Sequence, residues 1–171
     1  MNSKLFYSVL AVLVVGFVAL VMISQNQPKP QRLGDAHDDN GREHVKSKDY
    51  GNPDEPPTSG DHADPMPWGP YDRELPDVNT IHNLEHGGVY VSYQPDLPVE
   101  QVEAIKQLLF APYSDSEFQP NKVILAPRAA NASPITLSSW LRSEKLESFD
   151  KQKIIDYYNS NAGKSPEPLA P

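Results

Sequence analysis

The stretch TIHNLEHGGVYVSY, residues 80–93, changes from a helical pattern to an extended one at a pair of glycines. Residues 80–86 can form about a turn and a half of helix, which the glycine pair ends, and residues 88–93 alternate as a strand does. In such a helix His82 and His86 stand four residues apart on one face. The stretch therefore predicts a helix-to-strand unit with two imidazoles beside its turn.

Outward from this unit, helical and strand patterns follow each other along the chain. The clearest helix is LPVEQVEAIKQLLF, residues 97–110, in which apolar side chains recur on one face behind Asp96 as N-cap. Two short buried strands and a last helix capped by Ser148 are expected at residues 121–127, 134–140 and 148–159. This order predicts an α+β fold, a small and mostly antiparallel sheet with packed helices, in a single domain at residues 51–160.

An uncharged and mostly apolar run, LFYSVLAVLVVGFVALVMI, occupies residues 5–23. It is about long enough to cross a ~30 Å hydrocarbon layer as a helix, and no cleavage pattern of small residues follows it. We therefore expect a single-pass transmembrane anchor in the cell membrane rather than a removed signal peptide, with residues 1–4 cytoplasmic and the body outside the cytoplasm, periplasmic or at the cell surface. Residues 24–50 are expected to form a flexible tether and residues 161–171 a disordered tail.

Composition limits the partners and ligands that the chain can have. The net charge of −8 argues against nucleic acid, because nucleic-acid binding depends on clustered Lys and Arg. The chain has no cysteine, so a metal ion would have to be held by His, Asp, Glu or Met. The partners expected are the membrane, through the N-terminal helix, and a protein within it, while the oligomeric state stays open.

Three histidines of the predicted domain are the candidate metal ligands: His62, His82 and His86. Two imidazoles four residues apart on a helix can chelate one ion, and His62 can supply a third nitrogen from a proline-rich loop. Alternatively, the histidines bond backbone carbonyls at a tight turn and bind no metal. The pattern H-x-x-E-H also occurs in inverted zinc proteases, but the glycine pair cuts the helix short and no second motif follows. Glu85 is therefore expected to orient a histidine or to cap the adjoining loop.

Several segments occur together in this chain: PPTSGDH (56–62), PWGPYD (67–72), HNLEHGGVYVSYQPDLPVEQVEAIKQL (82–108), ILAPR (124–128) and ITLSSW (135–140). They resemble an uncharacterised bacterial family, domain-of-unknown-function family 3105, over roughly residues 50–159. The resemblance implies that His62, His82 and His86 recur together, with Glu85 beside them and Arg128 in a later segment, behind one N-terminal membrane segment. No activity is established for that family, so the resemblance sharpens the site rather than the function.

The resemblance also directs attention to the loop near Trp68, where some members of the family carry a cysteine that this chain lacks. Met66 is the local alternative, because a thioether beside imidazoles suits copper, whereas three imidazoles alone suit zinc as well. Arg128 is expected to be a solvated residue at the end of a strand or, alternatively, to bind an anion or Glu85 outside the ligand set. The sequence thus predicts a membrane-anchored domain that holds copper or zinc for binding, delivery or assembly, with no catalytic residue. The alternatives are a metal-free structural or partner-binding domain of a membrane complex and, less favoured, a zinc-dependent hydrolase.

Overall fold

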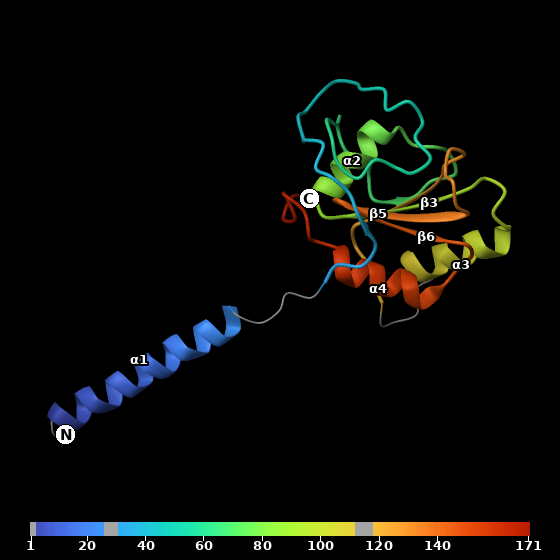
Figure 1. Cartoon of the computed structure of the whole chain (residues 1–171). Coiled ribbons are helices and arrows are strands. Elements are labelled where there is room, and N and C mark those ends of the chain that lie inside the picture. Colours follow the sequence, from blue (N-terminus) through green and yellow to red (C-terminus); the bar gives the residue numbers. More distant parts are fainter. Residues whose placement is uncertain (1–2, 26–30, 112–117) are drawn as a thin grey trace. The chain divides into compact units, whose positions relative to one another are not determined.

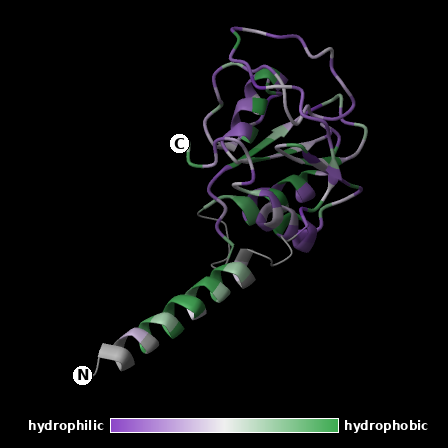
Figure 2. Ribbon diagram, turned by 60° about the vertical axis from the view of Figure 1, so that its left-hand side comes forward, coloured by the Kyte–Doolittle hydropathy of each residue, from purple (hydrophilic) through white to green (hydrophobic). Residues whose placement is uncertain are grey.

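The structure is a computed structural model that describes residues 3–25, 31–111 and 118–171 (Figure 1). The chain divides into two compact units, Met1–Gln31 and Arg32–Pro171. The first contains helix α1, Ser3–Gln25, along which hydrophobic residues predominate (Figure 2). Many of its apolar side chains are exposed. Within the described residues, no helix has both the length and the apolar character that spanning a membrane requires. The predicted transmembrane anchor is therefore not confirmed.

The second unit is built on a mixed sheet, which has six strands within the described residues. The strands are β1 (Asp35–Ala36), β2 (Gly69–Pro70), β3 (Val89–Tyr93), β4 (Val123–Pro127), β5 (Ile135–Ser139) and β6 (Arg142–Leu146). The helices are α2 (Asp77–Glu85), α3 (Val99–Leu109) and α4 (Lys151–Asn161). The strand order is β1-β6-β5-β3-β4-β2, in which β4 runs parallel to β3 and β2 and the other neighbouring pairs are antiparallel.

The predicted α+β class is confirmed, but the sheet is mixed rather than mostly antiparallel. The reason is the connection from β3 to β4, which passes through α3 and returns the chain in the same direction, as a helical crossover does. Strand β6 is not predicted from the sequence, because its residues, RSEKL, include a single large apolar side chain. The helix caps also differ: Pro98 precedes α3, and Asp150 caps α4 by accepting a hydrogen bond from the backbone N–H of Lys153.

Alternating side chains of the central strands bury two apolar clusters, one on each face of the sheet. Val91 and Leu125 belong to the cluster that contains residues of α3 and α4, whereas Tyr90 and Ile124 belong to the cluster that contains residues of α2. Accordingly, α2 lies over one face of the sheet, and α3 and α4 lie over the other (Figure 1). One side of α2 therefore packs against the sheet, and loops cover the other side of the helix.

The segment expected to be a tether belongs to the body from Arg32 onward. Strand β1 pairs with β6, and Arg32 donates hydrogen bonds to the backbone oxygen of Trp140 at 2.6 Å and to the side-chain oxygen of Asn161 at 2.9 Å. The prediction of a flexible tether is therefore wrong for residues 32–50, because their polar groups find partners on the sheet rather than in water. Residues 26–30 of the predicted tether lie outside the described residues.

The segment expected to be a disordered tail is also attached to the body. The backbone N–H of Gly163 donates to the oxygen of Gly87 at 2.9 Å, and that of Glu167 donates to the oxygen of Glu85 at 3.1 Å. The tail thus crosses the end of α2, where carbonyl groups left without helical partners accept its hydrogen bonds. The composition of residues 161–171 predicts disorder, but hydrogen bonds to these carbonyl groups hold the segment in place.

Candidate metal centre

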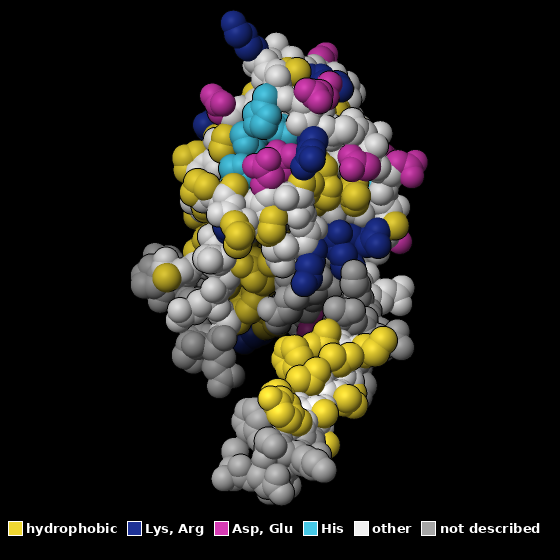
Figure 3. Space-filling view, turned by 90° about the vertical axis from the view of Figure 1, so that its left-hand side faces the viewer, with side chains coloured by type: hydrophobic (Ala, Val, Ile, Leu, Met, Phe, Trp, Pro, Cys, Tyr) yellow, Lys and Arg dark blue, Asp and Glu magenta, His cyan; other side chains and the backbone are white. Residues whose placement is uncertain are grey.

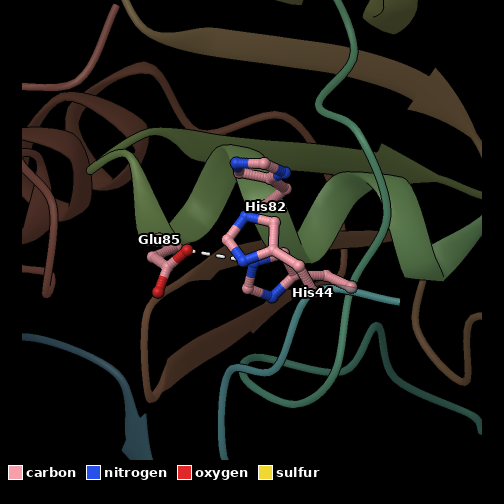
Figure 4. Close-up of side chains that lie close together, drawn as sticks. His44, His82 and Glu85 are labelled. Atoms are coloured by element: carbon pink, nitrogen blue, oxygen red, sulfur yellow. Dashed lines mark ion pairs between the residues drawn. The ribbon is translucent and has the colours of Figure 1, made fainter. Parts of the chain in front are cut away.

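Three histidines and a glutamate come together at α2. One ligand atom from each of His44, His62, His82 and Glu85 lies within 4.8 Å of all the others. Figure 4 shows His44, His82 and Glu85 close together, with the last two carried by the same helix. Histidine side chains gather on one face of the body, next to acidic and basic ones (Figure 3). The group can hold a metal ion.

Helix α2 supplies two members of the group and fixes their direction. His82 and Glu85 are three residues apart and therefore share a face, while Ile81 and Leu84 pack in the apolar cluster against the sheet. The helix ends where predicted, because Gly87 adopts a φ of 84°, which favours glycine. At Gly88 any Cβ would collide with the ring of Trp68. The glycine pair is thus needed both for the turn and for close packing beside the site.

A loop over α2 orients the imidazoles of His62 and His82. The Nδ1 atom of His62 lies 2.9 Å from the backbone oxygen of Gly60, and the Nδ1 atom of His82 lies 2.7 Å from that of Ala63. A carbonyl oxygen only accepts, so both Nδ1 atoms carry a proton, and in the neutral imidazole each Nε2 atom keeps a lone pair that can bind a metal. This is the pattern by which proteins orient histidines that bind metals.

His44 reaches the group through backbone pairing rather than through a helix. It forms an isolated parallel bridge with His62, in which the N–H of His62 donates to the oxygen of Glu43 and the N–H of Val45 donates to the oxygen of His62, both at 2.9 Å. The ring centroid of His44 lies 4.7 Å from the ring centroid of His62 and 4.9 Å from that of His82. The three imidazoles thus stand together although they come from three segments.

The contact between His62 and Glu85 fits a site built for a cation. Nε2 of His62 lies 3.0 Å from Oε2 of Glu85, and the two side chains are 0% and 1% exposed. Neither atom has a hydrogen-bond partner within the described structure. Buried polar atoms of this kind are rarely left unsatisfied. A protonated His62 would pair with the carboxylate, whereas a neutral one faces it with a lone pair. A cation between them would satisfy both.

The dimensions of the group are compatible with this interpretation. Four ligand atoms at roughly 2.1 Å from one ion are separated from each other by about 3.4 Å in a tetrahedral arrangement. The separations in the group reach at most 4.8 Å, so small rotations of the side chains would complete the geometry. The protonation state is also suitable: burial lowers the pKa of His82, and so do the neighbouring His62, His86 and His44, against the hydrogen bond to Ala63, which raises it. The net lowering of the pKa favours the neutral imidazole.

His86, a predicted ligand, lies beside the group but is not part of it among the described residues. Its ring centroid is 4.5 Å from that of His82. However, its Nδ1 donates to the backbone oxygen of Pro171 at 3.0 Å, and its Nε2 lies 4.0 Å from a carboxylate oxygen of Glu167. His86 is the C-cap residue of α2. Its side chain is therefore oriented by its contacts with the C-terminal tail rather than by the helix.

Met66 and Arg128 also differ from their predicted places. The backbone groups of Met66 bond the side chain of Asn83, and its own side chain packs in the apolar cluster on the α2 face of the sheet. Arg128 makes two hydrogen bonds to the carboxylate of Asp77, at 2.9 and 3.2 Å, and thereby ties the end of β4 to the first turn of α2. Arg128 therefore positions the helix that carries the site rather than contacting Glu85.

Sequence reasoning missed His44 altogether and placed Glu85 outside the ligand set. No local pattern marks His44, since it stands in a polar stretch and joins the site only through its bridge to His62. Glu85 follows His82 by three residues, a spacing that does place both on one helical face. That spacing was the available signal for a second ligand on the helix.

Comparison with known proteins gives one match. The family model described as "Protein of unknown function (DUF3105)" matches residues 44–171, so the matched region begins at His44 and contains the whole group. No curated protein and no solved structure matches the chain.

Proposed function

Because the chain belongs to the DUF3105 family of proteins of unknown function, we propose its role from the site alone: the body binds a divalent transition-metal ion through His44, His62, His82 and Glu85. The observation that carries the proposal is the buried contact between Nε2 of His62 and Oε2 of Glu85, which are 3.0 Å apart and otherwise unpartnered. A bound cation would remove the cost of leaving both atoms unsatisfied.

The donor set favours zinc. Three imidazole nitrogens and one carboxylate oxygen are ordinary ligands of zinc, which prefers four ligands in a tetrahedron. Copper(II) also binds imidazoles tightly and is the competing ion. Copper(I) is disfavoured, because Met66 packs in an apolar cluster and contributes no sulfur to the group.

The proposed role is to hold or deliver the ion, and catalysis is not part of the proposal. Hydrolytic zinc sites use three protein ligands and a water, with a separate base near that water. Here the glutamate that could serve as a base, Glu85, is itself a member of the four-residue ligand set. A set of four protein ligands suits storage, delivery or a structural contribution.

We place the body outside the cytoplasm, as the uncharged run at residues 5–23 suggests. The membrane attachment on which this placement depends is tested by fractionating cells that produce the chain with and without residues 1–31. Retention of the full chain in the membrane after an alkaline wash, and release of the shortened one, would support it. Equal release of both would contradict it.

The metal proposal is tested by measuring zinc and copper stoichiometry on the purified full-length chain. We expect about one ion per chain, none with His82→Ala, and weaker binding with His44→Ala, an exposed position whose change leaves the core intact. His86→Ala is the matched control, because it removes a neighbouring imidazole outside the group. Equal stoichiometry in all four proteins would contradict the proposal and favour a metal-free role for the His62–Glu85 pair.

A further inference from the structure

The proposed metal centre is buried in the protein except on one side, which faces the short segment that carries Arg42 and His44. His62, His82 and Glu85 are buried, whereas His44 is exposed. Arg42 stands in the same segment as His44, with 55% of its side chain exposed. Water thus reaches the centre next to one imidazole and one guanidinium.

Backbone pairing directs both of these side chains toward the centre. The N–H of Gly60 donates to the oxygen of Gly41 at 2.9 Å, which extends the bridge between His44 and His62 by one further hydrogen bond. In extended backbone, side chains two residues apart point to the same side. Arg42 therefore shares a side with His44, and its Nη1 lies 3.9 Å from Oε1 of Glu85.

The guanidinium of Arg42 has N–H donors without partners among the described residues. A separation of 3.9 Å is too long for a hydrogen bond to Glu85. Among the described residues, Arg42 makes no hydrogen bond through its side chain, although a guanidinium carries five N–H donors. These donors are free to bind a ligand that arrives from water.

The charges at the opening favour an anion. A divalent ion and Arg42 together carry more positive charge than Glu85 neutralises, and the imidazoles bound to the ion are neutral. Of the other charged groups nearby, Lys48 and Asp61 pair with each other at 3.0 Å, Glu167 lies 4.0 Å from Nε2 of His86, and Glu43 alternates to the other side of the segment. An anion at the opening would meet the ion and Arg42 together.

We propose that the metal centre takes an exogenous anion with two oxygens, a carboxylate or an inorganic oxyanion, at this opening. One oxygen binds the ion and a second accepts hydrogen bonds from Arg42, whose planar fork matches such a group. Zinc expands to five ligands when required, so the anion binds without displacing the protein ligands. This inference rests on the proposed metal function.

The test uses the full-length chain loaded with cobalt(II), whose visible absorption reports its ligands. Acetate and inorganic phosphate are titrated separately at constant ionic strength, which distinguishes a carboxylate from an oxyanion ligand. We expect a saturable change of the spectrum with at least one of them. Arg42→Gln should keep the cobalt stoichiometry and need at least about tenfold more anion, because it removes a charged hydrogen bond.

Two further variants make the result specific. Arg42→Lys keeps the charge but loses the fork, and should fall between the wild type and Arg42→Gln. Lys46→Gln removes an equal charge from an exposed position of the same segment and should bind the anion as the wild type does. An unchanged spectrum in the wild type, or equal anion dependence in the wild type and Arg42→Gln, would overturn the inference while leaving the metal site intact. Failure of the wild type to bind cobalt would instead overturn the proposed function, and the inference with it.

Discussion

Glu85 combines almost complete burial with an incomplete set of partners. Its carboxylate is 1% exposed, Oε2 meets only Nε2 of His62, at 3.0 Å, within the described structure, and Oε1 is 3.9 Å from Arg42. Burying a carboxylate in this state destabilises the folded protein unless a cation neutralises its charge. The same residue is thus expected to weaken the metal-free protein and to strengthen the metal-bound one.

Glu85→Gln should separate these two effects. Zinc affinity should fall by more than about 100-fold, because even residues that only orient metal ligands contribute 10–100-fold. The metal-free variant should be at least as stable as the wild type, since the new amide can donate to Nε2 of His62; a gain of about 1 kcal/mol is expected. The measurements are zinc titration and thermal unfolding in the presence of a chelator. A clear loss of stability without metal would show that His62 and Glu85 form a stabilising ion pair.

At the scale of elements, Lys122 attaches the C-terminal tail to the end of α2. Its Nζ donates to the backbone oxygens of His86 at 3.0 Å and Pro168 at 3.1 Å, and also to that of Ala170. Hydrogen bonds from an ammonium group are among the stronger ones in proteins. One cation among three carbonyl groups thus joins the tail to the end of α2.

Lys122→Met, which keeps the aliphatic stem and removes the donor, should release the tail. Trypsin should then cleave after Lys164 about tenfold faster, because cleavage follows the population of the open form. Mass spectrometry of timed digests measures the rate, and Lys151→Met, which removes an exposed charge on α4, serves as the control. Equal rates in the three proteins would mean that the other tail contacts suffice.

Glu55 fastens the proline-rich loop to β6 and gives that contact a pH dependence. Burial raises the pKa of Glu55, but hydrogen bonds from Lys145 and Ser143 outweigh it, so the net pKa is below the ordinary value of 4.5. A lowered pKa stabilises the folded state above pH 4.5, and that contribution is lost as the pH falls through the folded-state value.

Glu55→Gln should accordingly cost about 1 kcal/mol near neutral pH, since Lys145 is largely exposed and the pair is partly screened. The cost should shrink as the pH falls below 4.5, where the wild type also becomes uncharged. Urea unfolding of both proteins at several pH values measures the difference. A cost that stays constant down to pH 3 would assign the effect to packing.

Local pattern predicts those elements whose signals lie within their own residues. The glycine pair after α2 and the apolar face of α3 are such signals, and both elements are observed. The polar segments 32–50 and 161–171 carry no such signal, because their partners are carbonyl groups and strands distant in sequence. His44 was missed for the same reason, while His82 and His62 could be proposed from their residue type and from the resemblance.

At the scale of the whole molecule, the site joins three parts of the body: the segment with His44, the loop with His62, and α2 with His82 and Glu85. An ion that binds only the folded arrangement stabilises it by about 2.7 kcal/mol at a concentration 100 times its Kd. For a unit that spans residues 32–171, this corresponds to a rise in Tm of about 8 °C.

Thermal unfolding of the full-length chain in a series of zinc concentrations should therefore show a Tm that rises with the logarithm of free zinc. His44→Ala should reduce the rise and Lys46→Gln, two residues away and exposed, should not. Hydrogen exchange adds a local readout: the amide of Val45, which donates to the oxygen of His62, should exchange more slowly once zinc joins the two segments. A Tm that rises equally in His44→Ala, or unchanged exchange at Val45, would show that the N-terminal segment packs beside the ion without binding it.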